Sequence, residues 1–223
     1  MPDIDSFGPF ARLFALNPGY MALGHMDRDA SAPLRVITDL VRTVPLDGDK
    51  NIRELISDPN WRTQLFGTVA ALVSPEPACF VASLWESMDG GSWVSPQLAV
   101  VLFHSDPAFV THAKHRVSTG SPLRERNSSM DWLDRLLGGV FWHVESGPAS
   151  ATERSAKNVA ALLQLLESIP SERVWAQTER LKPEVAALLA LERDLSGEIA
   201  ASWQVGLREC FQEIGVPLSE PTA

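Results

Sequence analysis

Apolar residues in the middle of the chain recur at the spacing of amphipathic helices. Within residues 51–117 they form five short stripes whose members lie three and four positions apart, so each stripe falls on one face of a helix. Proline and glycine separate the stripes, at Asp58-Pro59, Pro75 and Pro77, Gly90-Gly91, and Asp106-Pro107. These residues end helices or begin them, and Asp58 is expected to cap the helix that Pro59 starts. The segment therefore predicts five short helices.

Helical stripes also precede and follow this segment. Residues 1–49 contain two, made of Phe7, Phe10, Leu13 and Phe14 and then of Leu34, Ile37, Val41 and Val44. Residues 130–215 contain several more, and the last of them, with Trp203, Leu207, Cys210 and Phe211, stops at Gly215. No run of alternating β-branched residues predicts a strand. We expect an all-α fold with a single domain over residues 1–223.

Two helix beginnings in the centre are similar in sequence. Asn60-Trp61-Arg62-Thr63-Gln64-Leu65 opens one apolar run and Trp93-Val94-Ser95-Pro96-Gln97-Leu98 opens another, 33 residues later at the glutamines. A second match, between 57–61 and 105–109, has a period of 48 residues. Such periods are typical of stacked helix pairs, because one pair cannot bury its apolar face alone. We expect stacked hairpins over 50–117, capped by helices in 1–49 and followed by helices in 130–215.

The same region is similar to a known repeat family. The residues that carry the likeness are Asp58-Pro59, Trp61-Arg62, Val69-Ala70-Ala71-Leu72, Leu84-Trp85, Asp89 and Trp93-Val94. They resemble short HEAT-like repeats over about residues 51–117, although Ser95-Pro96 stands where such repeats usually have an arginine. The resemblance implies an α-α superhelix with a scaffold or partner-binding role. It carries over no catalytic residues.

Composition and charge narrow the function classes. Of 223 residues, 45% are apolar, which is enough for a packed core, and no apolar run approaches the ~18 residues of a membrane helix. The first residues, Met1 to Asp5, are acidic where a secretory signal is basic, and Cys79 and Cys210 are isolated thiols. We expect a cytoplasmic protein without a membrane partner. The net charge of −9 disfavours nucleic acid and favours a basic partner.

Motifs for catalysis or cofactor binding are absent from the sequence. There is no Gly-x-Ser-x-Gly, no phosphate-binding Gly-x-x-x-x-Gly-Lys and no Gly-x-Gly-x-x-Gly. His112 and His115 are three residues apart, and His104 or Asp106 could complete a metal site with them. The zinc-protease spacing of two histidines four apart around a glutamate is missing, however, and surface histidines are the simpler interpretation. We predict no enzyme, no cofactor and no metal.

A small basic cluster and one tryptophan are the candidate partner contacts. The cluster runs from His112 to Arg126, and it either contacts an acidic partner or is a solvated helix end, the simpler alternative. Trp93 follows the turn at Gly90-Gly91, and tryptophan is enriched in binding hot spots, although packing in the core is the commoner fate of so large a side chain. The candidate partner-binding residues are Ser92, Trp93, His112, His115, Arg116, Arg124 and Arg126.

Three functions remain open at this point. The first is a non-enzymatic helical-repeat protein that binds another protein through the face built by residues 60–117. Immunity proteins, which neutralise toxins, and adaptors are examples of this class. The second is an enzyme or small-ligand binder with an interhelical pocket near Trp85, Trp93 and His104. The third is a homo-oligomeric structural protein that pairs through its last helix, 197–214.

Overall fold

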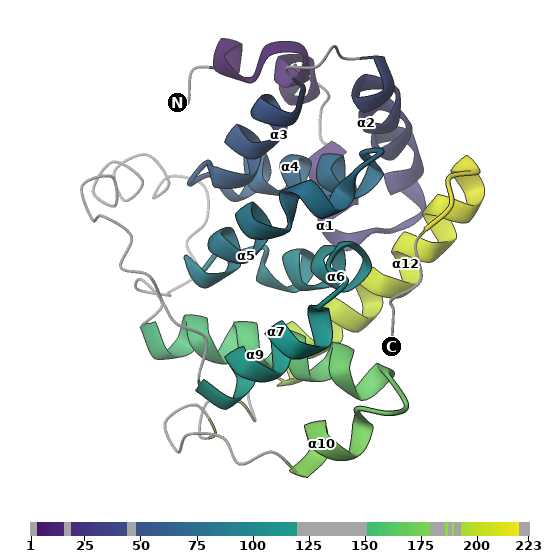
Figure 1. Ribbon diagram of the computed structural model, residues 1–223. Coiled ribbons are helices and arrows are strands. Elements are labelled where there is room, and N and C mark those ends of the chain that lie inside the picture. Colours follow the sequence, from purple (N-terminus) through teal and green to yellow (C-terminus); the bar gives the residue numbers. More distant parts are fainter. Residues whose placement is uncertain are drawn as a thin grey trace.

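The computed structural model describes residues 4–15, 19–43, 48–119, 151–178, 186, 189 and 193–218, and every regular element in these ranges is helical (Figure 1). The all-α prediction is confirmed. In chain order the elements are η1 (Ile4–Ala15), α1 (Gly19–His25), η2 (Arg28–Ala30), α2 (Ser31–Thr43), α3 (Gly48–Ser57), α4 (Trp61–Val73), η3 (Pro77–Phe80), α5 (Val81–Asp89), α6 (Ser95–Ser105), α7 (Phe109–Thr119), α9 (Ala151–Ser168), α10 (Arg173–Thr178), η4 (Arg193–Gly197) and α12 (Glu198–Ile214).

The five helices expected over 51–117 are all present, as α3, α4, α5 with its leading turn η3, α6 and α7. Helices α3 and α4 form a hairpin, α5 and α6 form a second, and the two hairpins stack with α3 against α5 and α4 against α6. The arrangement is compatible with a helical repeat. Two stacked hairpins bury the apolar edges that one hairpin leaves open.

Helices α4 and α6 lie at the centre and are buried on every side. All residues from Thr63 to Leu72 in α4 and from Ser95 to Ser105 in α6 are buried. Helices α1 and α2 cover α4, while α9 and α12 cover α6 (Figure 1). A helix that is apolar all round belongs in a core. The inner helices of the two hairpins therefore present no face for docking, and the accessible parts of 60–117 are the outer helices and the turns.

The two Asp-Pro turns have the same local structure. A carboxylate oxygen of Asp58 accepts a hydrogen bond from the Asn60 backbone N–H at 2.7 Å, and one of Asp106 accepts from the Ala108 N–H at 2.9 Å. The expected cap at Asp58 is wrong by two residues, because Asn60 caps α4 by accepting from the Arg62 N–H at 3.0 Å. The 48-residue match thus corresponds to two copies of one turn.

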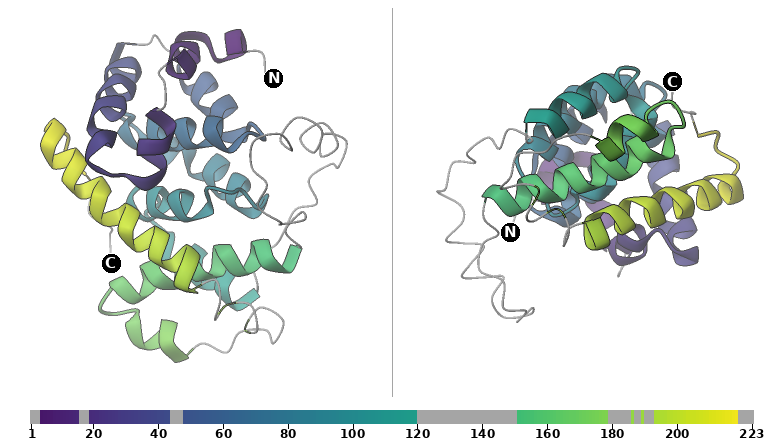
Figure 2. Two further views of the ribbon diagram at one scale, coloured as in Figure 1. Left: turned by 180° about the vertical axis from the view of Figure 1, so that it is seen from behind. Right: turned by 90° about the horizontal axis from the view of Figure 1, so that it is seen from below.

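Helix α12 joins the C-terminal part of the described chain to the N-terminal part (Figure 2). The indole N–H of Trp203 donates to the Leu23 carbonyl at 2.7 Å, and the Cys210 thiol lies 3.6 Å from the Asp27 carbonyl oxygen. Between them, Gly206 packs directly on the Met26 carbonyl. One face of α12 therefore contacts backbone carbonyls of α1 and of the turn that follows it.

The tryptophans of the described helices differ in burial. Trp85 and Trp203 are buried, whereas Trp61 is only partly buried. Trp132 and the stripe over 133–144 lie outside the described residues. None of the described helices combines the length and the apolar character that crossing a membrane requires.

Candidate functional site

The turn between α5 and α6, residues 89–94, is the candidate site. Gly91 has a φ of 76°, a conformation that glycine adopts without strain and that reverses the chain after α5. The Ser92 hydroxyl accepts from the Val94 N–H at 3.2 Å, and the Ser92 carbonyl accepts from the Ser95 hydroxyl at 2.6 Å. Ser92, a predicted partner contact, is itself buried and holds the turn together.

Gln64 of α4 anchors this turn from the core. Its side-chain oxygen accepts from the Ser92 hydroxyl, and its side-chain amide donates to the Ser87 hydroxyl at 2.9 Å. Ser87 in turn donates to the Ile56 carbonyl at 3.1 Å. The glutamine that stood out in the sequence repeat is therefore the link from the α3–α4 hairpin to the turn of the next hairpin.

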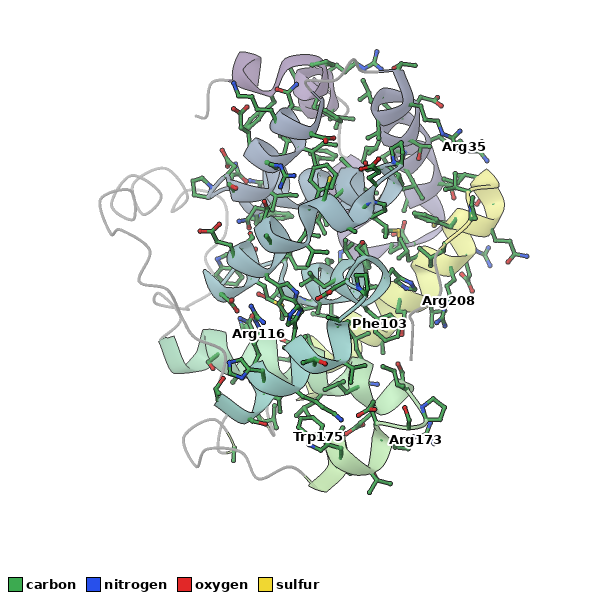
Figure 3. All side chains as sticks on the ribbon, in the orientation of Figure 1. Arg35, Phe103, Arg116, Arg173, Trp175 and Arg208 are labelled. Carbon is green, nitrogen blue, oxygen red and sulfur yellow. The ribbon has the colours of Figure 1, made fainter. Side chains whose placement is uncertain are left out.

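Two further helices hold the beginning of the turn. The Asn158 side-chain amide of α9 donates to the Met88 carbonyl at 2.8 Å. Arg116 of α7 donates to both carboxylate oxygens of Asp89, at 2.9 and 2.7 Å, and its guanidinium lies 3.9 Å from the centre of the Trp85 ring (Figure 3). Such a two-bond arginine–carboxylate pair fixes orientation as well as distance. The turn is thus fixed by α4, α7 and α9 together.

Trp93 stands on this fixed turn with its side chain 68% exposed. The expectation that so large an aromatic would pack in the core is wrong, because α6 begins only at Ser95 and Trp93 precedes it in the turn. The supposed equivalent, Trp61, is the first residue of α4. The Lys157 ammonium from α9 lies 4.8 Å from the centre of the Trp93 ring.

A second polar cluster joins α5, α7 and the turn between α6 and α7. One oxygen of the buried Asp106 carboxylate accepts from the Trp85 indole at 2.8 Å and lies 2.7 Å from Nδ1 of His112. Burial acts to raise the pKa of Asp106, but the hydrogen bonds from His112, Trp85 and the Ala108 N–H outweigh it and hold this pKa below its usual value. The cluster stabilises the start of α7, since Asp106 also accepts from Ala108 there.

The basic cluster of α7 contacts acidic groups within the protein. Arg116 pairs with Asp89, and Lys114 pairs with Glu172 while lying 5.0 Å from the Trp175 ring centre (Figure 3). The predicted contacts Arg116 and His112 therefore join helices to one another, and His115 is the exposed member. Arg124 and Arg126 lie outside the described residues.

The residues of the alternative ligand pocket do not share one environment. Trp85 and His104 are buried, whereas Trp93 faces solvent. No group of three or more His, Cys, Asp and Glu side chains in the described ranges is placed to hold a metal ion. Both thiols are free, and burial raises the pKa of Cys79 and of Cys210.

The sequence points to Trp93 as a candidate contact but gives no comparable sign of Lys157 and Asn158. Both belong to α9, more than sixty residues further along the chain, and no local pattern connects them to the turn. The polar Lys157-Asn158 pair in the stripe of α9 is the one available signal, since Asn158 falls on the buried face. Comparison of the chain with protein-family models, with curated proteins and with solved structures found no match.

Proposed function

We propose that the protein is a non-enzymatic binding protein whose partner is another protein, docked on the α5–α6 turn with Trp93 at the centre of the contact. The observation that carries the proposal is the exposed indole of Trp93 on a turn held by three helices. Tryptophan is among the residues most enriched at the energetic centres of interfaces.

Rigidity of the turn supports this choice. Binding costs free energy when loops and side chains must be ordered, and a surface that is already fixed avoids that cost. Ser92, Met88 and Asp89 are each bonded to a different helix, so the backbone on either side of Gly91 is held before any partner arrives. The backbone beneath this exposed aromatic therefore has little conformational entropy to lose.

The turn also remains accessible where the helices behind it do not. Helices α4 and α6 are buried throughout, so a partner that uses residues 60–117 has to contact outer helices and turns. Of these, the α5–α6 turn carries the large exposed aromatic. With a net charge of −9, long-range attraction favours a partner that is basic overall, as in immunity proteins that neutralise basic toxins or in adaptors.

The test compares Trp93→Ala with a matched control. Val174→Ala also removes an exposed apolar side chain, 71% exposed, but from α10. A partner captured by the wild-type protein and identified by mass spectrometry is titrated against all three forms by calorimetry. We expect Trp93→Ala to weaken binding by at least ~2 kcal/mol, about 30-fold, and the control to bind like the wild type. Equal affinity of wild type and Trp93→Ala would refute the proposal.

A second candidate function is self-association through α12. Helix α12 and the preceding η4 expose three apolar residues, Leu195, Ile199 and Val205, which are 43–54% exposed. A second copy that packs over them would remove them from water. Light scattering over a range of concentrations tests this candidate, with an Ile199→Glu and Val205→Glu double variant as the comparison. A mass that is monomeric at every concentration rules it out.

A further inference from the structure

Lys157 adds a charge requirement to the surface around Trp93. Its ammonium lies over the ring, 4.8 Å from the ring centre, so a partner that covers this face of the exposed indole also meets this cation. Ion pairs among the described residues use other cations, namely Arg35, Lys50, Lys114 and Arg116. Lys157 forms no ion pair with a carboxylate of the described residues.

Covering Lys157 without an anion would be unfavourable. An ammonium that loses water needs either hydrogen-bond acceptors or an opposite charge, and the indole face supplies only part of that compensation. A partner that buried Trp93 under purely apolar side chains would leave the cation desolvated and unpaired. The free energy of docking therefore depends on what the partner places next to Lys157.

We propose that the surface formed by Trp93 and Lys157 recognises a protein segment in which an Asp or Glu carboxylate lies beside an apolar side chain. The carboxylate accepts from the Lys157 ammonium, and the apolar side chain covers the Trp93 ring. This inference rests on the proposed function, because it specifies the partner of the same site. It requires one local carboxylate and is compatible with a partner that is basic overall.

Charge selects a carboxylate of a protein over a phosphate of a nucleic acid. The chain carries a net charge of −9, which repels a phosphate backbone over long range. Arg116, the cation that contacts the turn through Asp89, is already paired there. A single lysine next to an aromatic ring suits one carboxylate within a peptide better than a row of phosphates.

The experiment selects ligands from a displayed library of random twelve-residue peptides on the whole protein, at physiological salt, with counter-selection on Trp93→Ala. Enriched peptides are synthesised and their affinities measured for the wild type, Lys157→Met and Lys157→Arg. We expect Asp or Glu next to an aromatic or aliphatic residue in the peptides whose binding needs Trp93. We expect Lys157→Met to weaken them at least about 10-fold and Lys157→Arg to stay within about 3-fold of the wild type. Replacing the acid by its amide should give the same loss.

The outcomes separate this inference from the function it rests on. If peptides depend on Trp93 but are neutral or basic, or bind Lys157→Met as tightly as the wild type, the carboxylate requirement is wrong and the docking surface stands. If no selected peptide depends on Trp93, both are overturned. Far-UV circular dichroism of each variant establishes that the comparison is made between folded proteins.

Discussion

Replacing Gly206 by alanine should push the last helix away from the N-terminal part of the fold and destabilise the protein. A methyl group at this position would lie 2.0 Å from the Met26 carbonyl oxygen and 3.1 Å from its carbon. Both are backbone atoms, so no side-chain rotation relieves the overlap. Met26 itself has a φ of 49° and is buried, which leaves its backbone little room to move. The contact can be restored only if α12 moves outward by about 1 Å or more, given an ordinary carbon–oxygen separation of ~3.3 Å.

The expected loss in the free energy of unfolding follows from the contacts that this movement breaks. Trp203 donates to the Leu23 carbonyl at 2.7 Å, and a shift of about 1 Å would stretch this bond beyond hydrogen-bonding distance. A buried donor left unsatisfied costs about 1–3 kcal/mol, and overpacking a core costs about 1–3 kcal/mol. Alanine gains at most about 1 kcal/mol over glycine within a helix. We therefore expect Gly206→Ala to lower the free energy of unfolding by about 3 kcal/mol and the melting temperature by about 6–12 °C.

Urea unfolding followed by circular dichroism measures the effect. Gly24→Ala is the matched control, since a methyl group there would meet only the Leu65 side chain, at 3.8 Å. We expect the control to be neutral or slightly stabilising. If Gly206→Ala is too unstable to purify, Trp203→Phe removes the same hydrogen bond without the overlap and should cost about 1–3 kcal/mol. A Gly206→Ala protein within 0.5 kcal/mol of the wild type, a margin of about the size of surface effects, would refute the reasoning.

Three further predictions concern the helices around the α5–α6 turn, each checked by urea unfolding. Arg116→Met removes the two-bond partner of Asp89 and should cost about 2–3 kcal/mol, and Arg116→Lys should recover less than half of it; full recovery would show that charge alone matters. Asp106→Asn should cost about 1.5–3 kcal/mol at neutral pH. Because the folded protein holds the Asp106 pKa below its usual value, the wild-type advantage is present above the unfolded pKa of about 3.9 and is lost as the pH falls through the folded pKa; a difference independent of pH contradicts this. Gly67→Ala would place a methyl group 2.6 Å from the Ile56 nitrogen and should cost about 1–3 kcal/mol, whereas an unchanged unfolding midpoint would mean that α3 and α4 can separate freely.

The positions of the helices could be predicted from the sequence, because they depend on residues that are neighbours along the chain. The stripe of α12 and the breaks at Asp58-Pro59 and Asp106-Pro107 are features of neighbouring residues, and the structure has a helix end or a turn at each of them. Complete burial of α4 and α6 was harder to predict from the sequence. Their apolar stripes predict helices with one buried face, but residues on all sides of both helices are buried, since elements distant in the sequence cover them.

In the candidate site, too, features set by neighbouring residues could be predicted from the sequence, and features set by tertiary contacts could not. Turn chemistry at Gly91 and Ser92 is local, and the sequence predicted a turn there. Whether Trp93 packs inside or faces solvent depends on where α6 begins, and the 32-residue offset from Trp61 suggested an equivalence that the structure does not have. Arg116 was selected for its charge, and its partner Asp89 could not be identified because the pair joins two helices across a tertiary contact.

This pairing also decides which substitutions can test binding. Charge reversal at Arg116 would place a carboxylate opposite Asp89 and beneath the Trp85 ring, so it would disturb the turn that carries Trp93. Loss of a partner in such a variant would report the loss of the turn and not of a contact. Trp93 projects from the α5–α6 turn and Lys157 from α9. Neither side chain holds the turn in place, because the anchoring bonds come from Ser92, Asp89 and Asn158. Substitutions at these two residues therefore change the surface while the structure beneath it remains, and they are the ones from which a binding role can be established.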